Sequence, residues 1–493
     1  MNRLFLFCVG GTGSRVLKSL LMLLASGVEI NAHEIIPIII DPDQDNGDVE
    51  RTIRLLNFYQ SVQNSTVSEK SHFFKSKIRS LGTLREAGAV GSAFKMNIAG
   101  IGDSHGKTFR DFIQYNSLEP ATKSFLQLFY HEEKNLNSDL TVGFKGNPHM
   151  GSIVLNTLTD SADFNQLVST ITADDRIFIV SSIFGGTGAA GFPLLVKNIR
   201  QPDEKFIGKK AVLEQIPLGA LSVLPYFGVA RNDASAINKD TFIAKTKSAL
   251  AYYNNSLQDV DAMYYIGDQI SKDFENHEGQ AAQKNDAHFV EVAGALAIID
   301  FMSLGKESVK IAPKFKEFGI NEIASNADVS FPVLGSKSKQ AIAKHLIQLF
   351  YSIYHIENRL EYNMKDSNCP HTKGNPSIGS ARLETSLLNG DFYQNNFSYF
   401  TQAFKEWLQE LQRNNFSPFN FETTELQHLV QNVQQEKKGL LFKSDKWGFD
   451  EFNDALNEAE KQMGGLTATQ KLLALYSIAT EILYKDRMQV ALS

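Results

Sequence analysis

Two glycine turns are the strongest candidates for chemistry in this chain. Gly10 to Gly13 and Gly185 to Gly188 both read Gly-Gly-Thr-Gly, and each follows a short apolar run typical of a buried strand and leads into a helical pattern. Glycine permits positive φ angles, so several backbone N–H groups can face one anion, and a helix N-terminus favours negative charge. The pattern predicts a di- or triphosphate ligand. The alternative is that the glycines serve only the geometry of a strand-to-helix turn.

Two common phosphate motifs do not fit these turns. Neither turn is the GxxxxGK[ST] of a P-loop, and no basic residue follows where the P-loop lysine would stand. Neither is a clean GxGxxG, yet Gly11, Gly13 and the acidic strand end at Asp41 keep a Rossmann-type dinucleotide site as the second interpretation.

Acidic and amide side chains follow other predicted elements. Asp41 and Asp43 come directly after the apolar run Glu34 to Ile40, where they could contact a ribose hydroxyl or Mg²⁺, or simply close the strand with a turn. Asn285 and Asp286 begin a long apolar helical pattern. Residues of these types commonly cap the free N–H groups at the start of a helix.

The elements that must position these residues alternate between strands and helices, which predicts an α/β fold with a doubly wound parallel sheet. We expect a nucleotide-binding domain over residues 1–284, a central helix over 285–304, and a mostly helical C-terminal domain over 305–493. A helical insertion is expected at about 49–140. The individual helices expected in these regions are Val49 to Val62, Glu69 to Leu81, Glu119 to Glu133, Ser336 to Met364, Phe397 to Asn415, Thr423 to Glu436, Asp450 to Met463 and Thr467 to Met488.

The composition narrows the class of protein. The 493 residues are 43% hydrophobic and 21% charged, with a formal net charge of −6, which is typical of a soluble globular protein and gives no reason to expect nucleic acid as a partner. Cys8 and Cys369 are the only cysteines, so a disulfide framework or a cysteine-ligated metal is excluded. The histidines show no metal-ligand spacing. We expect a cytoplasmic protein without a membrane span.

Several of these segments resemble loops of the tubulin/FtsZ superfamily. The first phosphate loop of that family is similar to Gly10 to Gly13, and its Asn-Thr-Asp loop is similar to Asp41-Pro42-Asp43. Its loop Gly-x-x-Gly-x-Asn-Pro-x-x-Gly resembles Gly143 to Gly151, with Asn147 directly after Gly146. The order of these loops along the chain also agrees with the family.

Two further segments extend the resemblance, each with a departure. The tubulin signature Gly-Gly-Gly-Thr-Gly-x-Gly resembles Phe184 to Ala190, where Phe184 replaces the first glycine and Ala190 the last. The catalytic loop Asn-x-Asp-x-x-Asp resembles the segment from Asn326, but Phe331 stands in place of the second acid. Because a phenylalanine cannot activate water, the resemblance implies weak or degenerate hydrolysis.

The resemblance implies GTP or GDP with Mg²⁺ as ligands, and self-association head to tail into filaments, with a GTPase site completed at the subunit interface. Asn326 and Asp328 would be the catalytic residues. The implied nucleotide-binding residues are Gly10, Gly11, Thr12, Gly13, Asp41, Asp43, Gly146, Asn147, Gly185, Gly186, Thr187, Gly188, Asn285 and Asp286.

Two other functions remain open at this point. The chain could be a nucleotide-binding scaffold that has lost hydrolysis and acts on a protein partner through the insertion or the C-terminal domain, as the phenylalanine at position 331 favours. It could also be a Rossmann-type enzyme that binds NAD or FAD. Asn147-Pro148 and Asn285-Asp286 count against that third function, because a Rossmann fold has no use for them.

Overall fold

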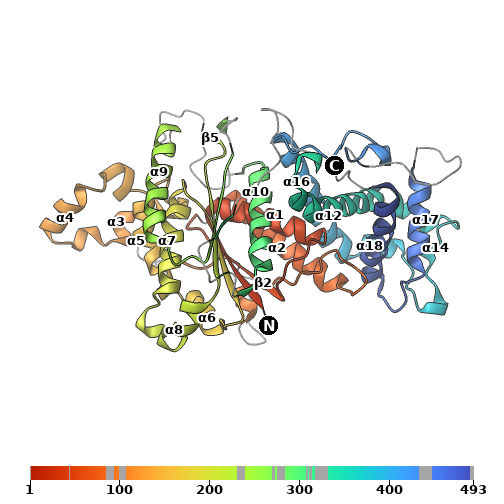
Figure 1. The fold of residues 1–493 in the computed structure, drawn as a ribbon, viewed down its shortest axis with the longest axis horizontal. Helices are drawn as coiled ribbons and strands as arrows, with labels where there is room; N and C mark the ends of the chain where they lie inside the picture. Colours follow the sequence, from red (N-terminus) through yellow and green to blue (C-terminus); the bar gives the residue numbers. More distant parts are fainter. Residues whose placement is uncertain are drawn as a thin grey trace.

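The computed structural model describes residues 2–43, 45–84, 94–98, 101, 107–229, 239–268, 273–274, 284–306, 309, 314–316, 331–431, 433 and 447–488. In this part of the chain a parallel sheet lies between two layers of helices, and the C-terminal helices pack beyond one of those layers (Figure 1). None of the helices in the described ranges is long and apolar enough to cross a bilayer.

The sheet confirms the predicted α/β class. Five parallel strands run in the order β2-β1-β3-β4-β6, and the short β8 extends the sheet beside β6. The strands are β1 (Arg3–Val9), β2 (Glu34–Ile40), β3 (Arg176–Ser182), β4 (Leu218–Val223), β6 (Ala262–Ile266) and β8 (Lys314–Lys316), and the two-residue strands β5 (Gly228–Val229) and β7 (Asp273–Phe274) pair separately. Because β1, β2 and β3 are buried on both faces, their sequences are continuous apolar runs.

The strand order reverses between β1 and β3. The chain leaves β1 toward β2 on one side and leaves β3 toward β4 on the other, so right-handed crossovers place the connecting helices on opposite faces. The first face is covered by α1 (Gly10–Ala25), α2 (Gly47–Thr66) and α10 (Phe289–Ser303), and the second by α5 (Pro148–Leu155), α6 (Ala162–Thr170), α7 (Gly186–Arg200), α8 (Lys210–Gln215) and α9 (Lys239–Ser256). In open α/β sheets such a reversal leaves a ligand crevice at the carboxyl ends of the strands.

The segment after α2 differs from its prediction. The helix expected over Glu69 to Leu81 is wrong, because the chain there runs beside β2 instead, with a parallel bridge between Ile35 and Ile78. Ile39 forms a second parallel bridge with Lys95. The edge strand β2 therefore obtains hydrogen bonds from backbone that has no regular secondary structure of its own.

The central helix starts later than predicted. Helix α10 begins at Phe289 rather than Asn285, because His288 takes the N-cap position and its Nδ1 accepts from the Val290 N–H at 3.1 Å. A Cβ on Gly294 would lie 2.8 Å from Leu221 and 3.1 Å from Val16, so this glycine lets α10 approach both β4 and α1. The helix is thus fixed against the sheet and against α1.

The C-terminal region is helical where it is described. Its helices are α12 (Ser336–His355), α13 (Glu361–Lys365), α14 (Pro370–Lys373), α15 (Thr385–Asn389), α16 (Ser398–Arg413), α17 (Phe449–Glu460) and α18 (Ala468–Arg487). The helix predicted from Thr423 is wrong over its described part, where only a short 3-10 turn forms at Leu426–His428. Trp407 is fully buried and its indole N–H donates to Ser19 of α1 at 3.2 Å, so this region shares one hydrophobic core with the sheet.

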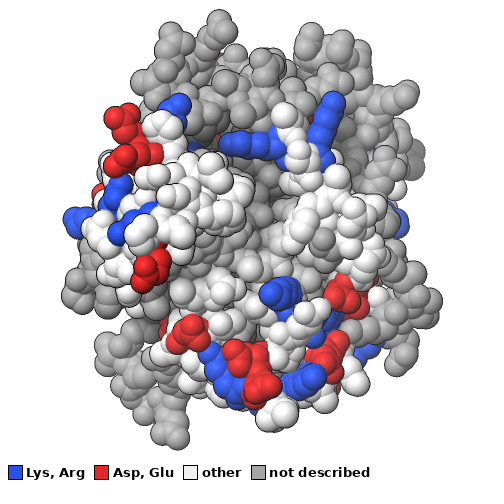
Figure 2. Space-filling view, turned by 90° about the vertical axis from the view of Figure 1, so that its left-hand side faces the viewer, with Lys and Arg blue, Asp and Glu red and all other residues white. Residues whose placement is uncertain are grey.

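A small helical hairpin projects at the other end of the molecule. It contains α3 (Phe109–Phe112) and α4 (Pro120–Gln127), and none of the α4 residues is buried (Figure 1). The surface at this end shows acidic and basic side chains interspersed, and neither sign forms a broad patch among the described residues in view (Figure 2). The described part of this face therefore shows no stripe of basic side chains.

Candidate functional site

The two glycine turns lie side by side at the point where the strand order reverses. Gly10 has a φ of +73°, and a Cβ there would lie 3.6 Å from the Thr187 Cβ and 3.8 Å from the Gly188 nitrogen. Helices α1 and α7 begin in these turns, and their N-cap residues, Val9 and Gly185, have no side chain that can accept from the first helical N–H groups. Two helix N-termini with free N–H groups therefore meet at one edge of the sheet.

The loop that contains Asn147 joins the same place. A Cβ on Gly186 would lie 3.0 Å from the Gly146 nitrogen and 3.2 Å from the Asn147 nitrogen. The Asn147 side chain donates to the carbonyl oxygens of Phe144 at 3.0 Å and Lys145 at 3.2 Å, so it shapes its own loop. Three loops that are far apart in the sequence thus converge, and together they form the candidate phosphate site.

The glycines of the two turns differ in what they do. A Cβ on Gly13 would lie 2.6 Å from the backbone carbon of Cys8, and one on Gly188 would lie 2.7 Å from the Ser182 oxygen, so both positions require glycine for close helix–strand packing. Gly11, Gly185 and Thr187 remain partly exposed, whereas Thr12 is buried. The partly exposed positions are those that a ligand can reach.

Asp41 and Asp43 are buried at the end of β2. Asp41 accepts from the Asp43 N–H at 3.0 Å and from the Asn46 amide at 3.4 Å, and burial raises the pKa of Asp41 to about 7. The Asp43 carbonyl accepts from Lys95 at 2.6 Å, and a Cβ on Gly143 would lie 3.8 Å from the Asp43 Cβ. A cavity of about 290 Å³ lies against this loop, lined by Asp41, Pro42, Lys95, Met96, Asn97, Ile98 and Ile101. The acidic loop therefore adjoins the start of the Asn147 loop, and its carboxylates take part in hydrogen bonds of their own turn.

Lys245 is a basic residue at the site that sequence patterns do not reveal. It lies on α9, is half-buried, and donates to the Gly146 carbonyl at 2.8 Å, its one polar contact within the described ranges. Burial lowers the pKa of its ammonium group, as expected for a cation without a counter-ion. An anion bound against the three loops would supply that counter-ion. The lysine belongs to no recognisable motif and is distant in sequence from both glycine turns, so only tertiary structure brings it here.

Aromatic side chains stand beside the second glycine turn. The half-buried rings of Phe184 and Phe227 pack edge to face with their centroids 5.6 Å apart, and Tyr226 packs against Phe227 at 4.8 Å. Aromatic faces of this kind are suited to stacking on a planar ligand group. Phe184, which the sequence resemblance aligns with the first glycine of the tubulin signature, thus places a ring at this edge.

Asn285 and Asp286 are engaged by the side chains of Asp48 and Arg413. Asn285 donates through its backbone N–H and its amide to the Asp48 carboxylate, at 3.3 and 3.4 Å. Asp286 accepts two hydrogen bonds from Arg413 of α16, both of 2.7 Å. The structure therefore joins these two residues to α2 and to the C-terminal region.

Beneath them, five buried charged residues and the partly exposed Arg51 form what we call the charged cluster. It consists of Arg15, Lys18, Asp48, Arg51, Glu291 and Glu410, from α1, α2, α10 and α16. Arg15 forms ion pairs with Glu291 at 2.7 Å and with Asp48 at 3.2 Å. Glu410 forms ion pairs with Lys18 at 2.5 Å and with Arg51 at 2.7 Å. With three charges of each sign, the cluster links the sheet region to the C-terminal helices.

The predicted catalytic residues Asn326 and Asp328 lie outside the described residues. Phe331, which stands in place of the second acid, is fully buried, and its ring packs edge to face on Phe416 and Phe419 at 6.1 and 5.7 Å. This position is therefore part of the hydrophobic core.

No protein-family model matches the chain, and no curated protein matches it in sequence. In the part of the chain that the structure describes, no group of three or more His, Cys, Asp or Glu side chains is placed to hold a metal ion.

Proposed function

We propose that the chain binds a guanine nucleotide, GTP or GDP with Mg²⁺, across the carboxyl ends of β1 and β3, as a divergent member of the tubulin/FtsZ superfamily. The observation that carries this proposal is the convergence of three loops. Gly10 lies against Thr187, and Gly186 lies against Gly146 and Asn147, at the point where the strand order reverses. Because β1 and β3 are neighbouring strands, the turns that follow them meet in any case, so the approach of the third loop, from Gly146 and Asn147, is the stronger observation.

In this proposal the phosphates accept hydrogen bonds from the N–H groups at the starts of α1 and α7, with the Thr187 hydroxyl as a further donor. Lys245 supplies the positive charge that a P-loop lysine supplies in other proteins. The base would lie toward Phe227 and Asp286. The Asn147 loop counts against a Rossmann-type dinucleotide enzyme, because that fold has no third loop packed on its glycine turn.

The described residues fit a magnesium ion that is bound mainly through the nucleotide. Mg²⁺ commonly takes one or two carboxylates, substrate phosphates and several waters. Asp43 borders the Asn147 loop and could supply one carboxylate, whereas Asp41, with its raised pKa, is partly protonated near neutral pH. The ion would neutralise phosphate charge and orient the terminal phosphate.

We propose that hydrolysis is weak and that self-association, head to tail in a filament, completes whatever catalytic site exists. The burial of Phe331 supports the first part, because this position offers no group that can activate water. The same observation favours the second candidate function, a non-hydrolysing scaffold that binds a protein partner. Both cysteines are free and buried, in keeping with a reducing cytoplasm as the place of action.

The test is nucleotide binding by the purified full-length chain. The protein is denatured to identify any released nucleotide, and the nucleotide-free protein is then titrated with GTP and Mg²⁺ by calorimetry. We expect Lys245→Gln to weaken GTP binding by about 10- to 100-fold, because a hydrogen bond to a charged group contributes about 1.5–3 kcal/mol. Thr187→Ala should weaken it less.

Lys247→Gln is the matched control, since Lys247 is exposed on the same helix two residues further on. It should leave the affinity unchanged. Wild-type affinity in both Lys245→Gln and Thr187→Ala would refute this site. Light scattering and phosphate release, measured at increasing protein concentration, distinguish a filament-forming GTPase from a non-hydrolysing scaffold. GTP turnover per subunit that rises with protein concentration indicates a catalytic site completed between subunits.

A further inference from the structure

Asp286, the residue proposed to read the base, is held by an arginine from the C-terminal region. The Arg413 Nε donates to one carboxylate oxygen and its Nη2 to the other, both at 2.7 Å. The Asp286 side chain is 31% exposed and that of Arg413 is 54% exposed. The pair is therefore in contact with solvent, where an exposed ion pair contributes little and can be exchanged for another partner.

The chemistry of this pair resembles that of a bound guanine. A guanidinium presents two parallel N–H groups to the two oxygens of a carboxylate. The N1–H and the exocyclic amine of guanine present the same pair of donors. Arg413 and a guanine base would therefore use the same face of Asp286, and both cannot occupy it together.

We propose that Arg413 occupies Asp286 in the nucleotide-free chain and that a guanine base displaces it on binding. This inference rests on the proposed function and adds a device to the same site. Arg413 acts as an internal competitor that lowers the affinity for guanine, and base binding releases one contact between the sheet region and α16.

The surroundings allow the arginine to leave without moving the loop. The backbone of the loop is held separately, because the Ala287 N–H donates to Glu410 at 3.1 Å and the Asn414 amide donates to the Ala287 carbonyl at 2.9 Å. Displacement of Arg413 is therefore a change of side-chain position on a fixed backbone.

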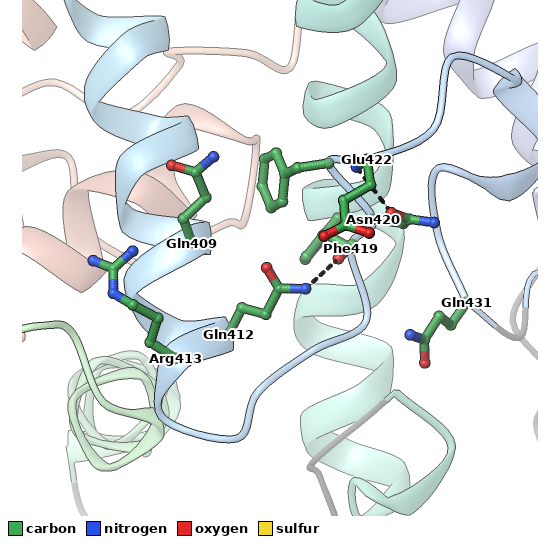
Figure 3. Close-up of a pocket in the computed structure, with 8 residues that line it drawn as sticks. Gln409, Gln412, Arg413, Phe419, Asn420, Glu422 and Gln431 are labelled. Atoms are coloured by element: carbon green, nitrogen blue, oxygen red, sulfur yellow. Dashed lines mark hydrogen bonds between the residues drawn. The ribbon is translucent and has the colours of Figure 1, made fainter.

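A polar pocket offers the released guanidinium a place. Arg413 lines a pocket of about 590 Å³ together with Gln409, Gln412, Phe419, Asn420, Phe421, Glu422 and Gln431. Gln409, Gln412 and Arg413 lie along α16 on one side, and Glu422 lies across from them (Figure 3). Among the described residues the Glu422 carboxylate has no hydrogen-bond or ion-pair partner, so it can accept the arginine.

The test compares GTP binding by the full-length wild type, Arg413→Gln and Lys405→Gln. Lys405 is the matched control, because it is also on α16 and also forms a partly exposed ion pair, with Glu357 at 2.8 Å. We expect Arg413→Gln to bind GTP about two- to fivefold more tightly, as loss of an exposed competing pair predicts. Lys405→Gln should bind GTP as the wild type does, and Arg413→Lys, which keeps the charge without the two-pronged geometry, should gain less.

A second comparison ties the effect to the base. Inosine triphosphate lacks the exocyclic amine, so the gain in Arg413→Gln should be smaller for this nucleotide than for GTP. In an Asp286→Asn background the Arg413→Gln substitution should produce no gain.

The failures of the two proposals are distinguishable. If no variant binds GTP, the proposed function is wrong and this inference falls with it. If the wild type binds GTP and Arg413→Gln binds it equally or more weakly, the nucleotide site stands and the role of Arg413 is refuted.

Discussion

The carboxyl edge of the sheet and the charged cluster differ in how their charged and polar groups are paired, although both include residues of α1. At the edge, the glycine turns present backbone N–H groups, and Lys245 has a carbonyl oxygen but no carboxylate as its partner among the described residues. In the charged cluster every charged side chain has an ion-pair partner of opposite sign. Both lie against α1, one at its first turn and the other along its next two turns.

A ligand site can be told from structural electrostatics by whether its charged groups already have partners in the folded chain. Buried charges that are fully paired and hydrogen-bonded hold elements together, and removing one partner leaves the other uncompensated. Donors and a cation without an anionic partner cost free energy in the folded chain, so their presence points to an anion that arrives later. A substitution in the charged cluster should therefore alter stability, whereas one at the sheet edge should mainly alter ligand affinity.

Acid should produce the largest loss of folding stability. Most of that loss should arise on the C-terminal side of the molecule. Five histidines there and at the α10 N-cap have their pKa lowered by burial: His72, His288, His345, His355 and His371. A pKa that is lower in the folded chain means that the unfolded chain binds more protons, so stability is lost as the pH falls from about 6.5 toward 4. For the two that are fully buried, His355 with a pKa of about 3 and His371 with one of about 4, the loss at pH 4 is about 3 kcal/mol each.

The measurement is the free energy of urea unfolding between pH 7 and pH 4. His355→Gln should shrink the difference between the two pH values by about 3 kcal/mol, whatever its effect at pH 7. Asp41 at the sheet edge has the opposite sign, because its raised pKa favours the folded chain at low pH and that contribution is lost as the pH rises through 7. A difference between pH 4 and pH 7 that is as large in His355→Gln as in the wild type would show that this histidine is not buried as described.

Removal of the Glu410 carboxylate should produce the second-largest loss of folding stability. Glu410→Ala leaves Lys18 and Arg51 without their shared carboxylate, and loss of one partner of a buried pair costs about 3–5 kcal/mol. The exposed Glu406 on the same helix is the control, and Glu406→Ala should change stability by less than about 0.5 kcal/mol. Chemical denaturation measures both. A Glu410→Ala protein as stable as the control would show that the charged cluster contributes little to the fold.

The smallest change in stability should come from the sheet edge, where the main effect is on binding. A Cβ on Gly188 would lie 2.7 Å from the Ser182 oxygen and 2.8 Å from its nitrogen, so Gly188→Ala must shift the turn, at a cost on the order of 1–3 kcal/mol. We expect GTP affinity to be lost from a chain that still folds. Gly208→Ala is the control, because no heavy atom lies within 4 Å of its Cβ position. Full GTP affinity in Gly188→Ala would contradict the assignment of this turn.

The residues alone predict the five longer strands and the two glycine turns. Apolar runs such as Arg176 to Ser182 appear as buried strands because a parallel strand covered on both faces needs apolar residues at nearly every position. The glycine turns were recognisable because positive φ angles and close helix–strand packing leave few other residue types. These are local constraints, and local sequence carries them.

Contacts between residues that are distant in the chain could not be predicted, because they depend on how the whole chain folds. The contact of Gly10 with Thr187, the arrival of Lys245 beside Gly146 and the engagement of Asp286 by Arg413 each join segments that are far apart in the chain. The sequence predicts a helix start at Asn285, but His288 takes the N-cap and Asn285 donates to Asp48 of the charged cluster instead. Such pairings follow from the strand order and the packing of whole helices, which no short stretch of sequence specifies.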